Sequence, residues 1–276
     1  MTIMTTIEKA VILARGRGTR MRADDGTTPL DERQASVART GVKALIPVGD
    51  RPFLDYVLST VADAGYRQIC LVVGPEQEAI RDYYTRSVPP SRLSIEFAVQ
   101  EEAQGTADAL LAAADFAGRD PFVMLNSDNF YPLEAYQGLA AQAGPAVALF
   151  ERDAMLRGSN IPEDRIARFA VGEIDEQGFL RRIIEKPDQQ TLAKLPQPLW
   201  VSMNCWRFGP SIFWACRSIP RSPRGEFELT AAVQYALDVL GERFRVLPVR
   251  APVLDLTSRG DIAQIEAQLG GMEIRL

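Results

Sequence analysis

Short apolar runs alternate with stretches of helical periodicity through the first 150 residues of the chain. Runs rich in valine, isoleucine and phenylalanine predict strands at residues 10–14, 68–73, 95–99, 122–125 and 146–150. Between these runs, the apolar residues of 53–64 recur on one helical face, and 106–114 predicts an alanine-leucine helix that begins at a threonine suited to capping. This alternation predicts an α/β fold with a mostly parallel sheet covered on both faces. Such sheets bind ligands beyond the carboxyl ends of their strands.

The second half of the chain has a more mixed pattern. Its predicted elements are an antiparallel pair of strands at 166–174 and 179–183 joined by a turn at 175–178, strands at 201–208 and 244–249, and helices at 227–240 and 262–269. No repeat or low-complexity linker divides the chain, so we expect one domain over 1–276 with an antiparallel subregion in its second half. Residues 23–41 are polar and turn-rich, and we expect a mobile loop or a short excursion there.

The first predicted strand runs directly into a glycine turn that carries clustered arginines. The stretch AVILARGRGTRMR, residues 10–22, holds Gly16 and Gly18 together with four arginines, in a chain whose formal net charge is −5. Glycines let backbone N–H groups approach phosphate oxygens, and guanidinium groups match phosphate geometry, so we expect a phosphate-bearing ligand. The dinucleotide pattern fails at Met21, where close helix packing needs a glycine, and the lysine of a P-loop is missing. By itself the turn leaves a nucleotide site and a purely structural role open.

Composition narrows the chemistry that the chain can perform. It contains no histidine, which excludes His-based triads and His metal sites and leaves proton or metal chemistry to carboxylates, lysine, tyrosine or water. Cys70, Cys205 and Cys216 lie far apart in apolar stretches, so we expect reduced core cysteines. No apolar run is long enough for a membrane span, and residues 1–8 lack the pattern of a signal peptide. We therefore expect a cytoplasmic protein that binds neither membrane nor, given its acidity, nucleic acid.

Further polar residues stand beside the predicted strands and helices. They are Lys43 before an apolar run, Gln104 and Gly105 at a helix start, Asp128 after a buried strand, the pair Glu185 and Lys186, and Asp255 in an apolar stretch. Each has an ordinary alternative, such as a solvated lysine, a turn-forming aspartate or a surface ion pair. An aspartate at the end of a buried strand is also a common place for a Mg²⁺ ligand.

In this order the motifs resemble those of the sugar nucleotidyltransferase family, the nucleoside-diphosphate-sugar pyrophosphorylases. The matching segments are the glycine turn at 16–20, the lysine segment at 43–52, QGTADA at 104–109, NSD at 126–128, EKP at 185–187, Asn204, and the aspartates Asp255 and Asp261. The resemblance implies a Rossmann-like mixed sheet, with a nucleotide-binding half over 8–150 and a sugar-phosphate-binding half over 151–276. Each signal alone is weak, but their common order covers nearly the whole chain.

The resemblance implies transfer of a nucleoside monophosphate from a nucleoside triphosphate to a sugar 1-phosphate, with Mg²⁺ as cofactor and pyrophosphate as the second product. The nucleotide we expect is UTP or dTTP. Two alternatives stay open: a GTP-dependent guanylyltransferase acting on mannose 1-phosphate or a cyclitol phosphate, and a non-catalytic relative that senses nucleotides. A nicotinamide dehydrogenase is disfavoured by Met21. The family often forms dimers or tetramers, and the sequence leaves the oligomeric state open.

The resemblance also assigns roles to individual residues. The expected catalytic residues are Arg20, Lys43 and Asp128; the nucleotide-binding residues are Leu13, Ala14, Gly16, Gly18, Thr19, Gln104 and Gly105; the sugar-phosphate-binding residues are Glu185, Lys186 and Asn204; and the metal ligands are Asp128 and Asp255. Two positions depart from the family pattern. Arg15 stands where the family has a small residue, and Asp255 lacks the tryptophan that commonly precedes it by two, since Val253 is there instead.

Overall fold

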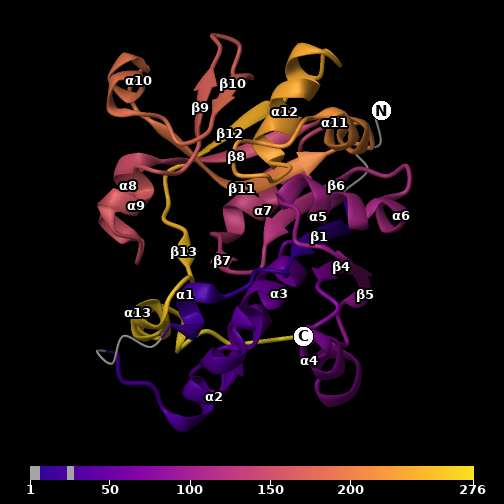
Figure 1. The fold of residues 1–276 in the computed structure, drawn as a ribbon, viewed down its shortest axis with the longest axis vertical. Coiled ribbons are helices and arrows are strands. Elements are labelled where there is room, and N and C mark those ends of the chain that lie inside the picture. The colour runs from indigo at the N-terminus through magenta and orange to yellow at the C-terminus, as the bar shows by residue number, and fades with distance from the viewer. Residues whose placement is uncertain (1–6, 24–27) are drawn as a thin grey trace.

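A nine-stranded sheet forms the centre of the computed structural model, which describes residues 7–23 and 28–276. The sheet has the order β10-β9-β11-β6-β1-β4-β5, and β8 pairs with both β11 and β12 (Figure 1). Its strands are β1 (Lys9–Leu13), β4 (Gln68–Val73), β5 (Ser94–Val99), β6 (Phe122–Asn126), β8 (Ala146–Glu151), β9 (Val171–Ile174), β10 (Leu180–Ile184), β11 (Trp200–Phe208) and β12 (Arg245–Val249). Two short ribbons pair β2 (Pro47–Val48) with β3 (Arg51–Pro52) and β7 (Asn129–Phe130) with β13 (Leu254–Asp255).

The first half of the sheet is parallel and the second half is mixed. Strands β6, β1, β4 and β5 run in one direction, so their carboxyl ends share one edge of the sheet. β11 is antiparallel to β6, β8 and β9, and β10 is antiparallel to β9. The predicted α/β architecture with an antiparallel subregion is confirmed. One predicted strand was too long, because Pro162 and the acidic residues after it begin a short helix where a strand was expected to start.

Helices cover both faces of the sheet. They are α1 (Thr19–Arg22), α2 (Glu32–Thr40), α3 (Phe53–Asp63), α4 (Glu78–Asp82), α5 (Thr106–Ala112), α6 (Ala114–Ala117), α7 (Leu133–Ala140), α8 (Arg152–Gly158), α9 (Glu163–Ile166), α10 (Gln189–Lys194), α11 (Ser211–Ser218), α12 (Leu229–Asp238) and α13 (Arg259–Leu269), with a 3₁₀ turn at Lys43–Leu45 and a π-helical turn at Tyr83–Ser87. In β1, Ala10 and Ile12 belong to one apolar core with α3, α7 and α13, whereas Val11 belongs to the other with α5, α11 and α12. The alternation of side chains along a buried strand thus joins two cores across one sheet.

The segment expected to be an irregular loop contains a regular helix. Asp31 accepts a hydrogen bond from the backbone N–H of Gln34 at 2.7 Å, and the Gln34 side chain accepts one from the Asp31 N–H, which makes a capping box for α2. The helix ends at Gly41, whose φ of 77° is left-handed. The prediction of a loop is therefore wrong for residues 32–40, and residues 24–27 of the same segment lie outside the described part of the chain.

The three cysteines are free and buried, as expected. Burial raises the pKa of the Cys70 thiol and that of the Cys216 thiol to about 12. Among the helices in the described ranges, none is both long and apolar enough to cross a membrane.

Candidate active site

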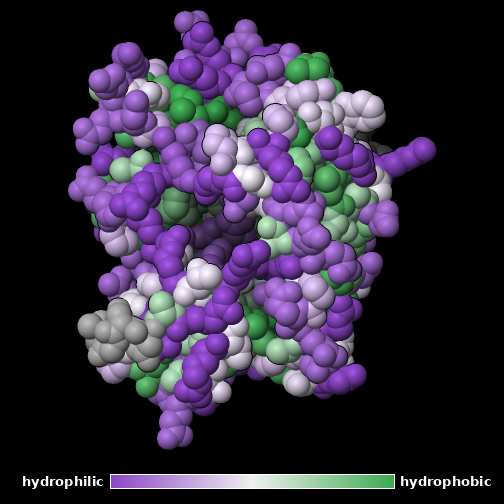
Figure 2. Space-filling model, viewed as in Figure 1, coloured by the Kyte–Doolittle hydropathy of each residue, from purple (hydrophilic) through white to green (hydrophobic). Residues whose placement is uncertain are grey.

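A cavity of about 590 Å³ opens at the edge where the parallel strands end. Figure 2 shows it as a hollow lined by hydrophilic residues near the middle of the face viewed. Its walls come from the segments that follow β1, β5 and β6, from the turn at Lys43–Leu45, and from the loop that precedes α12. This is the place where ligands bind in open α/β sheets, and the volume suits a ligand the size of a nucleotide.

The glycine turn forms one wall of the cavity and is packed closely. Leu13, Ala14 and Gly16 line the cavity, and a Cβ on Gly16 would lie 3.4 Å from the Cε atom of Lys43. Gly18 has a φ of 59°, and a Cβ there would lie 2.8 Å from the carbonyl carbon of Gly41. Gly18 is therefore required for backbone packing, and neither it nor Thr19 is among the residues that line the cavity.

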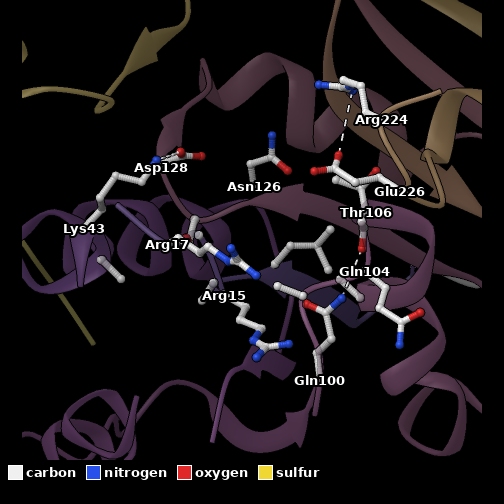
Figure 3. A pocket seen from close by; sticks show the side chains of 18 of the residues that line it. Arg15, Arg17, Lys43, Gln100, Gln104, Thr106, Asn126, Asp128, Arg224 and Glu226 are labelled. Carbon is white, nitrogen blue, oxygen red and sulfur yellow. Dashed lines mark hydrogen bonds and ion pairs between the residues drawn. The ribbon is translucent and has the colours of Figure 1, made fainter. Parts of the chain in front are cut away.

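Lys43 and Asp128 form an ion pair within the cavity. The Lys43 ammonium donates to the Asp128 carboxylate, and both side chains are largely buried. Figure 3 shows the pair on one side of the cavity, with Asn126 beside it. The turn at Lys43–Leu45 and the end of β6 bring together two residues that the sequence placed in separate motifs. The ammonium is in a position to neutralise an anion that binds near Asp128.

Asp255 lies close to Asp128 because β13 pairs with β7. The register matches Asp255 with Asn129, and the N–H of Leu256 donates to the Asp128 carbonyl at 2.8 Å. Burial raises the pKa of the Asp255 carboxyl, and the Asp128 charge raises it further. The Arg165 guanidinium, at the end of α9, lies 2.7 Å from the Asp255 carboxylate and opposes this shift. The carboxylates of Asp128 and Asp255 therefore lie close together. Each is paired with a different cation, Lys43 for Asp128 and Arg165 for Asp255.

The opposite end of the cavity contains Gln100, which the sequence reasoning missed. Its side chain is buried, and its Nε2 donates to Gly105 O at 3.1 Å and to Asp108 Oδ2 at 2.7 Å. These bonds fix the orientation of the amide, whose Oε1 accepts no hydrogen bond within the described part of the chain. The signal in the sequence is its position directly after the apolar run of β5, at the ligand-binding edge.

Gln104 and Gly105 line the cavity, but their contacts hold a loop. The Gln104 side chain bonds to Glu102 and to Arg221, and its carbonyl accepts from the Phe227 N–H at 2.7 Å. Gly105 has a φ of 115°, and a Cβ there would lie 2.7 Å from Phe227 N. Both residues thus fix the loop over 219–228 against the cavity. The expectation that Gln104 reads a base stays a prediction.

Arginines surround the cavity, although Arg20 is not one of them. Arg15, Arg17, Arg221 and Arg224 line it, whereas Arg20 is exposed on α1 and lies outside the described lining. Arg224 is 2.9 Å from Glu228 and 3.8 Å from Glu226 (Figure 3). These guanidiniums and Lys43 make the cavity a suitable site for a polyanion.

None of the residues expected to hold a sugar phosphate is among the described residues that line this cavity. Glu185 lines a smaller cavity of about 370 Å³, which shares Arg221 with the larger one. Lys186 and Asn204 have φ values of 45° and 57°, and no other non-glycine residue in the described ranges has a positive φ. Asn204 stands where β11 shifts register against β8. Strained backbone of this kind is concentrated at functional sites, so both residues remain candidates.

Comparison with known proteins identifies the family. A family model described as nucleotidyl transferase matches residues 9–246. The chain belongs to this family. The resemblance drawn from the sequence motifs is thereby confirmed, and Asp255 lies beyond the matched residues.

Curated relatives of this nucleotidyl transferase are distant and mostly longer. It is 30% identical over 232 residues to a glucose-1-phosphate thymidylyltransferase of Streptomyces griseus, covering 83% of this chain and 57% of the relative. It is 28% identical over 231 residues to a low-salt glycan biosynthesis nucleotidyltransferase of Haloferax volcanii, again covering 57% of the relative. A UTP–glucose-1-phosphate uridylyltransferase of Haloferax volcanii is 29% identical over 228 residues, with 82% of each chain covered. The chain thus spans little more than half the length of the first two relatives.

A solved structure of a UDP-glucose pyrophosphorylase complexed with UDP-glucose has the same fold. Its TM-score to this chain is 0.74, with 17% sequence identity and coverage of 97% of this chain and 100% of the other. At this identity the similarity establishes the nucleotide-diphospho-sugar transferase fold, as the resemblance implied.

Proposed function

We propose that the protein transfers a nucleoside monophosphate from a nucleoside triphosphate to a sugar 1-phosphate. The observation that carries the proposal is the pairing of Lys43 with Asp128 beside the glycine turn, inside one cavity at the carboxyl edge of the sheet. Membership of the nucleotidyl transferase family supports it, as do relatives named for thymidylyl and uridylyl transfer to glucose 1-phosphate.

The proposed reaction is a substitution at phosphorus. An oxygen of the sugar phosphate attacks the α-phosphorus of the triphosphate, the bond between that phosphorus and the bridging oxygen breaks, and pyrophosphate leaves. The attacking oxygen is already anionic at neutral pH, so no general base has to remove a proton from it. This agrees with a chain that contains no histidine. Catalysis then depends on positioning the reactants and neutralising their charge.

The residues of the cavity suit these tasks. Gly16 leaves room for a phosphate beside the backbone, and Arg17 adds a cation there. Lys43 would stabilise charge that develops on the phosphates. Arg224, on the side of the cavity formed by the 219–228 loop, would attract the phosphate of the sugar. Lys186, Glu185 and Asn204 keep their proposed contacts with the sugar phosphate.

We include Mg²⁺ in the proposal, held by Asp128 and Asp255. The donor set fits, because both side chains offer hard carboxylate oxygens and lie close enough for the charge of Asp128 to act on Asp255. No cluster of three acidic, cysteine or histidine side chains able to hold a metal occurs in the described residues. Phosphate oxygens and water would complete the coordination, as Mg²⁺ prefers in nucleotide sites. When bound, the ion would neutralise phosphate charge as a Lewis acid.

The proposal also includes the identity of the nucleotide, the domain organisation, the cellular location and the assembly of subunits. UTP or dTTP is the nucleotide suggested by the resemblance, with the GTP-dependent and the non-catalytic alternatives still open. A single domain is supported by the sheet, which contains strands from both halves of the chain. We propose a cytoplasmic location, as expected from the sequence pattern, and an assembly of identical subunits, which the family resemblance suggests.

A matrix of nucleotides against sugar 1-phosphates tests the proposed function. Purified protein with Mg²⁺ is offered GTP, UTP, dTTP, ATP and CTP, each with glucose 1-phosphate, mannose 1-phosphate and a cyclitol phosphate, and pyrophosphate release is measured. We expect release that needs both substrates and is lost in Lys43→Ala. If no pair releases pyrophosphate while the nucleotides still bind, the non-catalytic alternative takes its place.

A further inference from the structure

The segment that follows β13 returns to the glycine turn. Figure 1 shows the chain running from β13 into α13, which lies beside α1. Arg259, the first residue of α13, is buried, and its Nε donates to the Met21 carbonyl at 3.1 Å. Its Nη2 donates to the Arg22 carbonyl at 3.3 Å. One arginine thus joins the start of α13 to the end of the short helix that leaves the glycine turn.

The end of α1 is suited to this contact. The last carbonyls of a helix have no partner within the helix, and arginine side chains commonly donate to them. Because α1 has only four residues, its conformation depends on contacts with the rest of the protein. Met21 is fully buried in the core on the same helix. Arg259 and Met21 therefore hold the downstream end of the glycine turn, while the pairing of β1 within the sheet holds its upstream end.

The stretch between Asp255 and Arg259 is held by its own hydrogen bonds. Asp261 Oδ2 accepts from the N–H of Thr257 at 2.9 Å and from the N–H of Ser258 at 2.6 Å. The Thr257 hydroxyl in turn donates to the Asp255 carboxylate. These bonds make the stretch rigid, so Asp255 and Arg259 keep a fixed separation. They also give Asp261 a task, since its carboxylate caps α13.

This stretch connects two parts of the candidate active site. At one end Asp255 lies near Asp128, and at the other Arg259 holds the turn whose Gly16 and Arg17 line the cavity. In-line transfer requires the triphosphate on the turn and the charged groups beside it to keep a fixed geometry. Arg259 itself is not among the described residues that line the cavity, so its effect on a ligand has to pass through the turn.

We propose that Arg259 is a positioning residue for nucleotidyl transfer, which holds the glycine turn at the distance from Asp128 and Asp255 that the triphosphate requires. The proposal rests on the proposed function, since it concerns the nucleotide of the same site. Without the guanidinium, the turn loses its contact at the α1 end. The triphosphate then binds more weakly and lies less often in the geometry for attack.

Two variants of Arg259 test this role through turnover. Arg259→Met keeps most of the side-chain length but none of the donors, and we expect kcat/KM for the nucleoside triphosphate to fall by about 10²-fold. KM for glucose 1-phosphate should keep its wild-type value, because other segments would bind that substrate. Arg259→Lys keeps the charge and one donor group, so its values should lie between the two. Initial rates of pyrophosphate release with UTP, dTTP and GTP provide the comparison.

Nucleotide binding in EDTA gives a second measurement that needs neither turnover nor metal. Calorimetric titration of the full chain with UTP, dTTP and GTP is done without a sugar phosphate. We expect Arg259→Met to bind each nucleotide about tenfold more weakly than the wild type, the loss that follows when one hydrogen bond to a phosphate is weakened. Since the turn contacts phosphates rather than the base, the three nucleotides should be affected alike.

Arg207→Met is the matched control. Arg207 is buried, and its Nη1 donates to the carbonyls of Leu139 at 3.3 Å and Ala140 at 3.2 Å at the end of α7, away from the glycine turn. It therefore makes the same kind of contact with a helix end. Arg207→Met should lose a similar free energy of unfolding in urea but keep the wild-type affinity for nucleotides. A merely structural role of Arg259 predicts the same nucleotide affinity for both variants.

Three results would overturn the positioning role. They are wild-type nucleotide affinity and kcat/KM in both Arg259 variants, equal losses of affinity in Arg259→Met and Arg207→Met, and an equal rise of KM for glucose 1-phosphate. If Arg259→Met does not fold, judged by reaction of the buried cysteines, Arg259→Lys decides between the same outcomes. Failure of the wild type to bind any nucleotide, even with Mg²⁺, would contradict the proposed function instead, which separates the two conclusions.

Discussion

The Arg165 guanidinium lies 2.7 Å from the Asp255 carboxylate, in a region that also contains Asp128. In Arg165→Met, the buried Asp255 carboxylate would lose its own cation while still facing the charge of Asp128, so we expect the free energy of unfolding to fall by about 3 kcal/mol in EDTA. Mg²⁺ should restore part of this loss, because it would neutralise the same carboxylates. Chemical denaturation with EDTA and with Mg²⁺ measures both effects.

Arg152→Met is the control for this prediction. Arg152 pairs with the exposed Glu163 at 2.9 Å, so its removal should cost less than about 1 kcal/mol and show no response to Mg²⁺. Equal destabilisation of Arg165→Met with and without Mg²⁺ would argue against a metal at Asp255.

Lys43→Ala should lower kcat by about 10²- to 10³-fold, because it removes the cation that faces the reacting phosphates. The folded state should tolerate the change, since Asp128 keeps access to solvent at 25% exposure. Lys9→Ala removes a lysine that pairs with Asp120 at 2.7 Å outside the cavity, and it should retain wild-type kcat. Steady-state pyrophosphate release measures kcat for both; similar values would refute the role of Lys43.

Gly105→Ala should both destabilise the protein and weaken substrate binding. Its positive φ alone costs about 1–3 kcal/mol for a residue with a side chain, and the added Cβ would also push against the Phe227 backbone. Displacing the 219–228 loop would move Arg224 and raise KM for the sugar phosphate. Gly118→Ala is the control for backbone strain alone. Gly118 has a φ of 60°, but no neighbour is close enough to clash with an added Cβ. If both variants raise KM equally, the loop is not positioned by Gly105.

Arg17→Ala should raise KM for the nucleoside triphosphate more than Arg20→Ala does. Arg17 lines the cavity, whereas Arg20 is exposed outside the described lining. Removal of a cation near the phosphates costs about tenfold in affinity if it contacts them. Initial rates over a range of nucleotide concentrations give both values. A larger effect in Arg20→Ala would restore the role that the family resemblance assigns to Arg20.

Asp55 should make stability decline as pH rises. This carboxyl is fully buried and accepts hydrogen bonds from Tyr83 at 3.0 Å and Tyr84 at 2.9 Å, yet burial outweighs these bonds and raises its pKa above 3.8. Because the folded state holds this proton more tightly than the unfolded state, the stabilisation is complete below the unfolded pKa and is lost as pH rises through the folded pKa.

Asp55→Asn removes this titration while keeping an acceptor for the tyrosines. The free energy of unfolding of the wild type minus that of the variant should therefore fall from pH 3.8 upward and level off above the folded pKa. Urea denaturation of both proteins across this range provides the comparison. A difference that grows with pH would reverse the assigned direction.

Local sequence signals predicted the strands and singled out Lys43 and Asp128, but they did not predict the contact between these two residues or the place of Gln100 at the opposite end of the cavity. The apolar runs of β1, β4 and β6 are recognisable because strands buried on both faces are almost wholly apolar. Gln100 and Gln104 are both glutamines in a polar segment after an apolar run. Gln100 is the buried one because it directly follows the last residue of β5. The capping box of α2 was visible at Asp31 and Gln34, but the polar composition around it favoured a loop.

Contacts between distant segments were beyond any local pattern. Arg165 on α9 reaches Asp255 on β13, and Arg15 reaches the Glu101 carbonyl past Gly74, where a Cβ would lie 2.7 Å from Arg15 Nε. Neither relationship follows from periodicity or from turn chemistry, since both depend on how separate elements pack in three dimensions.

The pairing of β13 with β7 also determines when Asp255 reaches Asp128 during synthesis of the chain. The parallel strands and the glycine turn emerge from the ribosome early, and such a unit begins to fold first. Leu254–Asp255 must then pair with Asn129–Phe130 across a long stretch of chain, a contact of high sequence separation that forms slowly. A nascent chain would thus place the glycine turn beside β6 well before Asp255 reaches Asp128, so completion of the proposed metal site would be a late event in folding.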